Sequence, residues 1–317
     1  MMNVYLAGFV FAVPTSVYPQ YLKALPRPVR ELLSFYDFCK AGPTRTKELL
    51  YMEHRCELFL DSGAFSAWSK GVTIDIDEYA KFVLDHPDAF SVVTNLDVIP
   101  RAWGEVPSQK QIDESAAKGW ENYWYLAEKI KPLGLKPLHV FHQGEDVKWL
   151  KKLIGEAEYF GVSPGNDRTT KQKIAWLDEI MPLLTDDKGR AIRKFHGFGV
   201  TSFDILERYP WYSVDSTSWV LTGRFGACFV PLNGKVHKVI FSDKSPKATE
   251  EGEHFKTFSV MEQKAILTYL EQKGYTPQEL AEQYQKRDEL NIIFFLDLEK
   301  NWTDKVFKKA AVQPTFF

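Results

Sequence analysis

Short apolar runs alternate with longer amphipathic stretches over the first two thirds of the chain, and this alternation constrains the fold more than any other feature. Short apolar runs are typical of buried parallel strands, and amphipathic stretches between them are typical of covering helices. The strand-like runs are Asn3–Phe9, Leu33–Phe38, Cys56–Leu60, Ser91–Leu96, Leu138–His142, Tyr159–Val162, Lys194–Phe198 and Trp211–Val214. The pattern therefore predicts an α/β fold.

Helical patterns occupy the segments between these runs. They are Arg45–Glu53, Ile76–Leu84, Gln109–Ile130, Asp146–Gly155, Lys171–Leu184 and Ser202–Glu207. Eight strands with intervening helices match a (β/α)8 TIM barrel, and 317 residues exceed the roughly 250 that such a barrel needs. Prolines make the connection after the first strand irregular, so the first helix is the least regular of the set.

The pattern changes after Asp215. Ala227–Leu232 and Lys235–Phe241 flank Asn233-Gly234, a dipeptide that supplies the positive φ of a type I′ hairpin turn. A polar loop follows over Ser242–Lys256, and three helical patterns then cover Phe258–Lys273, Thr276–Gln285 and Arg287–Trp302. We expect a catalytic barrel over residues 1–226, and a hairpin with C-terminal helices packing on it over residues 227–317.

Composition favours a globular enzyme of the cytoplasm. Hydrophobic residues make up 44% of the chain and the net charge is only −2, so overall charge does not indicate a general nucleic-acid binder. Three scattered cysteines (Cys39, Cys56 and Cys228) fit a reducing compartment. The chain start lacks the basic leader of a signal peptide, and no run reaches the roughly 20 apolar residues that cross a membrane, so no membrane partner is expected.

Four polar residues each follow a short apolar run: Asp61, Asp97, Gln143 and Asp215. In a barrel of parallel strands such residues converge on one mouth, where the active sites of these barrels lie. Three carboxylates and an amide in one cleft favour bond-breaking chemistry over plain binding. The alternative is structural, because Asp before Ser-Gly also occurs in turns and Asp before Ser-Thr also caps helices.

Several motifs resemble one enzyme family. Phe59-Leu60-Asp61-Ser62-Gly63-Ala64-Phe65 resembles the Asp-Ser-Gly-Gly-aromatic signature of the tRNA-guanine transglycosylase (queuine tRNA-ribosyltransferase) superfamily. His196-Gly197-Phe198-Gly199 resembles its Met-Gly-Val-Gly strand end, and Asp215, Arg224 and Gly226 match its nucleophile segment without a gap. Gln143-Gly144 and the helix Arg287–Lys300 have counterparts in the same order, so the resemblance covers most of the chain.

Two features resemble the compact phage and bacterial branch that inserts 7-deazaguanine into DNA. The tryptophan-containing segment Pro210–Trp219 is unlike the tRNA enzymes. Those enzymes also carry a three-cysteine zinc site after the hairpin, whereas no cysteine follows Cys228 here, so no metal of that type is expected.

The resemblance implies a two-carboxylate mechanism. Replacing a base breaks a C1′–N bond through an oxocarbenium-like transition state, which a carboxylate traps while a second group handles the proton. Asp215 would be the nucleophile that forms a covalent intermediate, and Asp61 would be the general acid/base. Asp97 and Gln143 would read the base edge, with Asn95 as the fallback for Asp97 because it shares that strand face.

Further residues would complete the binding site. Phe65 and His196 occupy the positions that sandwich the base in the family, and stacking holds a flipped base. Ser163-Pro164 replaces a Gly-Gly, so Ser163 lies at the base but a backbone donor is lost at Pro164. Arg224, Lys235 and Lys238 would contact phosphates of the nucleic-acid backbone. The structural alternatives are a buried strand histidine for His196 and a solvated hairpin face for the two lysines.

Three functions follow from these observations. The first is base exchange, in which guanine in DNA, or in tRNA as the alternative substrate, is replaced by a 7-deazaguanine such as preQ0. The second is a DNA glycosylase of the same fold that excises a modified base and leaves an abasic site. The third is a nucleic-acid-binding barrel without catalysis, which the paired Asp61 and Asp215 disfavour because clustered carboxylates repel each other. None of these chemistries needs a cofactor.

Overall fold

The computed structural model describes residues 2–8, 25–50, 55–101, 105–165, 167–200 and 202–308. Within them, a sheet of eight parallel strands runs in the order β4-β3-β2-β1-β8-β7-β6-β5. The strands are β1 (Asn3–Ala7), β2 (Val29–Ser34), β3 (Arg55–Asp61), β4 (Val92–Val93), β5 (Val140–His142), β6 (Tyr159–Ser163), β7 (Lys194–Gly197) and β8 (Ser213–Ser216). The α/β class expected from the sequence is confirmed.

The sheet is strongly curled. Its two end strands are linked by a parallel bridge between Thr94, just after β4, and Leu138, just before β5. The Asn95 N–H donates to the Leu138 carbonyl at 2.9 Å, and the Leu138 N–H donates to the Val93 carbonyl at 2.7 Å. Hydrogen bonds therefore connect strands that stand at opposite ends of the sheet order.

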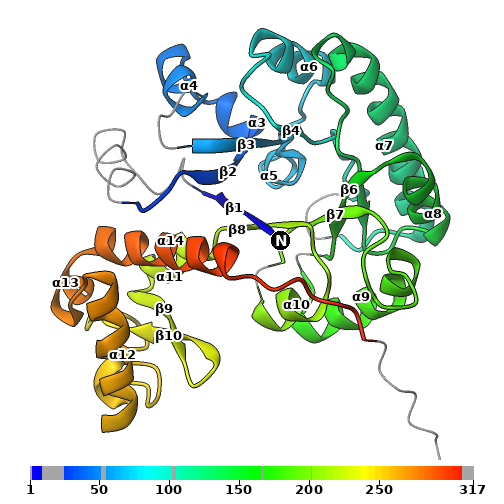
Figure 1. Ribbon diagram of the computed structural model, residues 1–317. Helices are drawn as coiled ribbons and strands as arrows, with labels where there is room; N and C mark the ends of the chain where they lie inside the picture. Colours follow the sequence, from blue (N-terminus) through cyan, green and yellow to red (C-terminus); the bar gives the residue numbers. More distant parts are fainter. Residues whose placement is uncertain are drawn as a thin grey trace, which may run out of the picture.

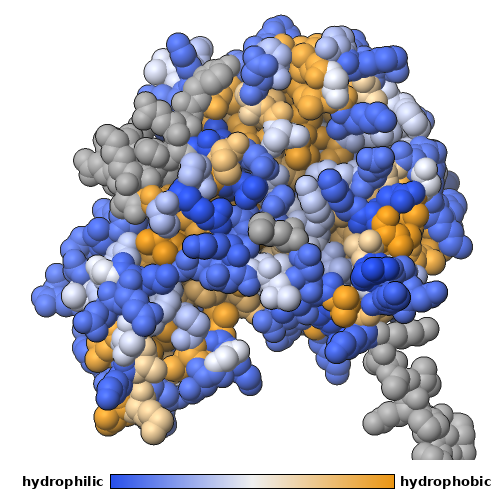
Figure 2. Space-filling view, in the orientation of Figure 1, coloured by the Kyte–Doolittle hydropathy of each residue, from blue (hydrophilic) through white to orange (hydrophobic). Residues whose placement is uncertain are grey.

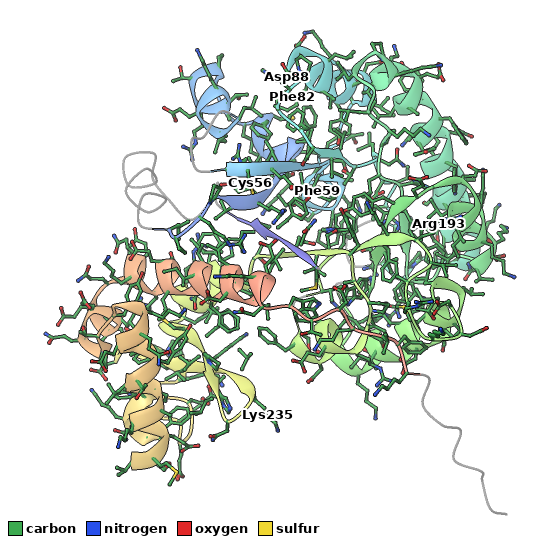
Figure 3. The ribbon with its side chains drawn as sticks, in the orientation of Figure 1. Cys56, Phe59, Phe82, Asp88, Arg193 and Lys235 are labelled. Atoms are coloured by element: carbon green, nitrogen blue, oxygen red, sulfur yellow. The ribbon has the colours of Figure 1, made fainter. Side chains whose placement is uncertain are left out.

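Side chains from distant strands meet inside the curl. Tyr5 of β1 lies edge-on to Phe59 of β3, with ring centroids 5.1 Å apart, and Phe59 lies 4.7 Å from the ring of His196 on β7. Figure 3 shows Phe59 toward the middle of the molecule and Cys56, near the start of the same strand, toward its edge. These ring contacts connect β1, β3 and β7 across the inside of the curled sheet.

Helices cover the outer face of the curled sheet (Figure 1). The helices before the hairpin are α3 (Phe35–Phe38), α4 (Pro43–Leu50), α5 (Ala64–Trp68), α6 (Ile76–Asp85), α7 (Gln109–Ile130), η1 (Lys131–Leu133), α8 (Val147–Glu156), α9 (Thr170–Leu184), α10 (Phe203–Arg208) and α11 (Ser218–Arg224). Ser108 and Thr169 begin α7 and α9 with capping boxes, in which side chains satisfy the unpaired N–H groups of the first turn.

A hairpin and helices form a second group after α11. The hairpin pairs β9 (Ala227–Leu232) with β10 (Lys235–Ile240), and Asn233 and Gly234 take φ of 52° and 73° at its turn, as predicted. It is followed by η2 (Phe255–Thr257), α12 (Val260–Lys273), α13 (Pro277–Glu282) and α14 (Tyr284–Lys300). Figure 2 shows mostly hydrophilic side chains on one face of the molecule, with hydrophobic ones in the upper part, between α4 and α6, and in the C-terminal group around α12.

The helix α14 attaches this group to the sheet. Glu299, 3% exposed, accepts a hydrogen bond from the Val4 N–H of β1 at 3.0 Å. It also forms ion pairs with Arg27 and with Arg30 of β2. The helix α14 therefore packs on the sheet at the beginnings of β1 and β2.

One predicted element is wrong in position. The second strand was expected over Leu33–Phe38, but β2 ends at Ser34 and Phe35–Phe38 forms the helix α3. Charged residues obscure the strand in the sequence. Glu31 is fully buried in β2, where it pairs with Arg55 of β3, so a residue that suggests a surface lies in the interior. The expected Phe9 end of the first strand lies outside the described residues.

Candidate functional site

The predicted polar residues lie at the carboxyl ends of the parallel strands. Asp61 is the last residue of β3, Asp215 lies in β8, Ser163 ends β6 and Gln143 follows β5. Asp97 comes three residues after the Thr94 bridge. Because all of these strands are parallel, their ends meet at one edge of the sheet.

Asp61 occupies a turn that its neighbours fix. Gly63 has φ of 75°, and its N–H donates to Asp61 Oδ2 at 3.0 Å. The Ser62 N–H donates to the Thr94 hydroxyl at 2.7 Å, which ties this turn to the end of β4. A glycine is needed at Gly63 because an L side chain is strained at this φ and a Cβ there would meet the Ser34 hydroxyl.

The pKa of Asp61 rises to about 7. Burial of the carboxyl group is the main cause, and the negative charge of Asp97 is the next, while the Gly63 hydrogen bond acts in the opposite direction. The charges of Asp215 and Asp37 also raise it. The structure therefore brings Asp61, Asp97 and Asp215 into one electrostatic cluster.

His142, the last residue of β5, lies between two carboxylates. Its Nε2 is 3.2 Å from Asp97 Oδ2, and its Nδ1 is 3.1 Å from Glu145 Oε1. Burial lowers the pKa of His142, but the charges and hydrogen bonds of Asp97 and Glu145 outweigh it and raise the pKa well above its ordinary value. An imidazolium therefore fixes the Asp97 carboxylate beside Asp61.

Asp215 has a side chain that is 14% exposed. Its Oδ1 accepts a hydrogen bond from the Gly199 N–H at 3.2 Å and lies 3.4 Å from His196 Nε2. The carboxylate is thus held from one side and remains reachable from solvent.

His196 does not have the role that the sequence suggested. The residue is fully buried, and its ring contacts Phe59 and Phe198 at centroid distances of 4.7 and 4.4 Å. A ring with no exposed face cannot stack on a base, so the predicted sandwich position is wrong. His196 instead faces Asp215.

Asn95 is also corrected. The residue is fully buried, its Nδ2 donates to the Gly119 carbonyl of α7 at 2.8 Å, and the same nitrogen lies 2.9 Å from His139 Nδ1. Asn95 therefore faces the covering helix rather than the strand-end edge, and it does not read a base.

Gln143 and Ser163 lie together. The Gln143 N–H donates to the Ser163 carbonyl at 3.0 Å, and Gln143 Oε1 accepts from the Gly165 N–H at 3.0 Å. Pro164, which follows Ser163, has no N–H. The N–H of the next residue, Gly165, is already bound to Gln143. The described residues accept no hydrogen bond from Gln143 Nε2, so this donor is available to a ligand.

Phe65 offers an aromatic surface near Asp61. It lies on α5, is 45% exposed, and its ring centroid is 5.4 Å from that of Trp68. The Trp68 indole donates to the Arg101 carbonyl at 2.5 Å. Phe65 is thus exposed, and its stacking role stays a prediction.

The predicted phosphate contacts lie on α11 and on the hairpin. Arg224 ends α11 and lines a cavity of about 710 Å³ formed with residues of the C-terminal group. Lys235 and Lys238 are exposed on β10, and Figure 3 shows Lys235 at the outer end of the hairpin. No ion pair or hydrogen bond joins these two lysines to Asp61, Asp97 or Asp215 within the described residues.

Three residues near the carboxylates were not predicted as site residues. Burial raises the pKa of Asp37 on α3 to about 6. Lys173 on α9 donates to the Gly199 carbonyl at 3.4 Å, and burial lowers its pKa although Asp167 and Asp215 raise it. Glu145 binds His142. Asp37 was hidden by the misplaced second strand, and Lys173 carries no sequence signal.

Two cavities lie away from the carboxylates. The 710 Å³ cavity belongs to the C-terminal group, and another of about 600 Å³ is lined by residues near the starts of β7 and β8, including Arg193, Lys194 and Tyr212. Among the described residues no cluster of His, Cys, Asp and Glu is arranged to hold a metal ion. In the same residues no helix is both long and apolar enough to cross a membrane.

Comparison with known proteins does not assign a family. No protein-family model matches the chain, and no curated protein shows significant similarity to it.

Proposed function

We propose that the protein is a base-exchange transglycosylase that replaces guanine in DNA by a 7-deazaguanine. The observation that carries the proposal is the cluster of Asp61, Asp97 and Asp215, in which the pKa of Asp61 rises to about 7 while Asp215 stays partly exposed. A group with a pKa near neutrality is suited to give and take protons at physiological pH.

The fold in this proposal is a closed (β/α)8 barrel. The bridge from Thr94 to Leu138 joins the two ends of the sheet order, and rings from β1, β3 and β7 fill its interior. In such barrels the active site is built from the carboxyl ends of the strands, where all three carboxylates lie.

The reaction takes place in two steps. Asp215 attacks C1′ of the nucleotide, the C1′–N9 bond breaks, and its electron pair goes to the departing base, which takes the proton of Asp61. The incoming 7-deazaguanine then returns its N9 proton to Asp61 while N9 displaces Asp215 from C1′. This is the two-step logic of retaining glycosidases.

The base is held by three side chains in this account. Phe65 stacks on it, and the Asp97 carboxylate, held by His142, accepts hydrogen bonds from its edge. Gln143 Nε2 donates to it, because Gln143 Oε1 is already engaged by Gly165. The motifs around Asp61, Gln143 and Asp215 resemble the transglycosylase superfamily and support the same assignment.

One observation favours hydrolysis as the second candidate. The Gly165 N–H is bound to Gln143, and Pro164 supplies no N–H, so this strand end offers no backbone donor for the carbonyl of an incoming base. A glycosylase that admits water to C1′ in place of a second base would need no such donor.

The test uses labelled DNA, with tRNA in a parallel sample, incubated with preQ0 and related 7-deazaguanines. The nucleic acid is then digested to nucleosides, and the nucleosides are identified by mass spectrometry. New deazaguanosine in DNA supports exchange, and alkali-labile abasic sites without exchange support the glycosylase. Label in tRNA alone makes tRNA the substrate.

Asp215→Ala should abolish either product, whereas Asp88→Asn should not. Asp88 is exposed next to α6, at the periphery of the molecule in Figure 3. Equal product from Asp215→Ala and the wild type would refute the nucleophile assignment.

A further inference from the structure

A chain of hydrogen-bonding groups runs from Asp215 into the centre of the curled sheet. Asp215 Oδ1 lies 3.4 Å from His196 Nε2, and His196 Nδ1 lies 2.8 Å from the Ser213 hydroxyl. The same hydroxyl lies 2.7 Å from the Tyr159 hydroxyl. The chain thus links β8, β7 and β6 through side chains that face the interior.

Donors and acceptors along this chain fit one arrangement. A carboxylate only accepts, so His196 Nε2 must carry a proton to make a favourable contact with Asp215. Burial lowers the pKa of His196, although Asp215 raises it, so the ring is neutral and Nδ1 is an acceptor. The Ser213 hydroxyl then donates to Nδ1 and accepts from the Tyr159 hydroxyl, and every group is satisfied.

The surroundings make this chain unusual for a barrel interior. His196 and Ser213 are both fully buried, and Phe59 and Phe198 pack on the His196 ring. A buried polar group is costly without hydrogen bonds, and an apolar side chain would fill the same space more cheaply. Here the polar groups instead end on the one carboxylate that the proposed reaction uses as nucleophile.

We propose that His196, Ser213 and Tyr159 are positioning residues that hold one oxygen of Asp215 and leave the other, Oδ2, as the atom that bonds to C1′. The inference rests on the proposed function for the identity of the attacked carbon. The Gly199 N–H and His196 Nε2 both engage Oδ1, and the described residues make no hydrogen bond to Oδ2. Two donors on Oδ1 fix the rotamer of the carboxylate and direct Oδ2 toward the strand-end edge.

This arrangement predicts a specific role for Ser213. Without its hydroxyl, Nδ1 has no hydrogen-bond partner, while Asp215 still favours the proton on Nε2. The His196 ring then loses one of its two anchors and can turn away from Asp215, so Oδ1 is held less firmly and Oδ2 is less well directed. Misplacing a nucleophile by about 1 Å costs on the order of 100-fold in rate.

The first measurement is nitrogen NMR of the protein labelled in its histidines, at neutral pH. The wild type should show His196 neutral with its proton on Nε2, and Ser213→Ala should keep that proton while the Nδ1 resonance moves toward that of an acceptor without a hydrogen bond. A wild-type ring protonated on Nδ1 alone, or on both nitrogens, would refute the proposed hydrogen-bond arrangement. This readout needs no substrate, so it decides the hydrogen-bond chain even if no nucleic acid reacts.

The second measurement is single-turnover formation of the protein–DNA adduct, with DNA affinity measured separately. Ser213→Ala and His196→Leu should lower the rate on the order of 100-fold at unchanged affinity. His196→Gln retains an N–H donor in place of Nε2 and should recover most of that loss. His196→Leu at the wild-type rate would refute the positioning role, and if it does not fold, Ser213→Ala provides the same comparison.

His139→Gln is the matched control. His139 is also a buried histidine and lies just before β5, but it contacts Asn95 rather than a carboxylate. Its adduct rate should equal that of the wild type. If the wild type forms no adduct with DNA or tRNA, the proposed function fails, while the NMR result still decides whether the chain exists.

Discussion

Asp61 has a carboxyl group whose protonated form is favoured in the folded protein, because burial and the charge of Asp97 both raise its pKa, to about 7. In the unfolded chain the pKa returns to an ordinary value near 3.8. Folding therefore takes up a proton between these two values. The stability that Asp61 contributes is complete below pH 3.8 and is lost as the pH rises through 7.

Asp61→Asn removes the ionised form and should stabilise the protein at pH 8 by on the order of 2–4 kcal/mol. Near pH 4 the variant and the wild type should have the same free energy of unfolding, since the wild-type carboxyl is then protonated in the folded state. Urea unfolding at both pH values measures the difference. Asp88→Asn, at an exposed site, should show no such pH dependence, and a wild type as stable at pH 8 as Asp61→Asn would contradict the raised pKa.

Asp97 contributes to the pKa of Asp61 through its negative charge. Asp97→Asn should lower that pKa, so Asp61, the proposed general acid, loses its proton at a lower pH. The decline of kcat at high pH should move down by roughly one pH unit. The pH dependence of base release at saturating DNA measures this shift. If kcat declines at the same pH in Asp97→Asn and in the wild type, the charge of Asp97 does not affect the proposed proton donor.

The sequence predicted the carboxylates at the strand ends but not the geometry around them. An apolar run followed by Asp is visible in the sequence, whereas burial is not, so the exposed Phe65 and the buried His196 were assigned the same stacking role. Asn95 was assigned to the wrong face because the strand β4 is only two residues long and alternation does not continue past it. His142 comes directly before the predicted residue Gln143 in the sequence. Its pairing with Asp97 joins segments that are distant in the sequence, so it could not be predicted from the sequence.

At the level of elements, Gly63 connects β3 to α5 and thereby orients Asp61. Gly63→Ala places a Cβ 2.1 Å from the Ser34 hydroxyl and 2.7 Å from Tyr36 Cβ, at a φ of +75°. The variant should lose on the order of 1–3 kcal/mol of stability, because strain and overpacking combine. Thermal unfolding measures the loss.

Gly71→Ala is the control for that variant. Gly71 has a similar φ of +68°, but no atom lies within 4 Å of an added Cβ, so only the backbone strain remains. A loss equal to that of Gly63→Ala would show that the contacts with Ser34 and Tyr36 do not matter.

Helices were predicted more closely than strands. The expected Gln109–Ile130 helix matches α7, because a 3.6-residue period over several turns is unambiguous. The second strand was displaced because Arg30 and Glu31 break its apolar pattern, and only ion pairs to other elements explain their position. A short helix after Asp215-Ser216-Thr217 was expected only as the structural alternative for Asp215, and α11 does begin there, at Ser218.

On the scale of the whole molecule, Glu299 joins the C-terminal helix to the sheet. Glu299→Ala leaves Arg27 and Arg30 without this partner and the Val4 N–H without its acceptor. We expect a loss on the order of 3 kcal/mol in the free energy of unfolding, measured in urea. Glu271→Ala, on the exposed face of α12, should change stability little, and equal effects of the two variants would show that the Glu299 contacts contribute nothing.

The proposed mechanism requires Asp215 to become covalently attached to a nucleic acid. The most direct measurement is mass spectrometry of the protein after brief reaction with DNA and rapid acid quenching, followed by peptide mapping of the adduct. We predict an adduct on the peptide that contains Asp215, absent from Asp215→Asn and present in Asp88→Asn. An adduct on another residue, or base release by the wild type without any adduct at early times, would contradict the mechanism.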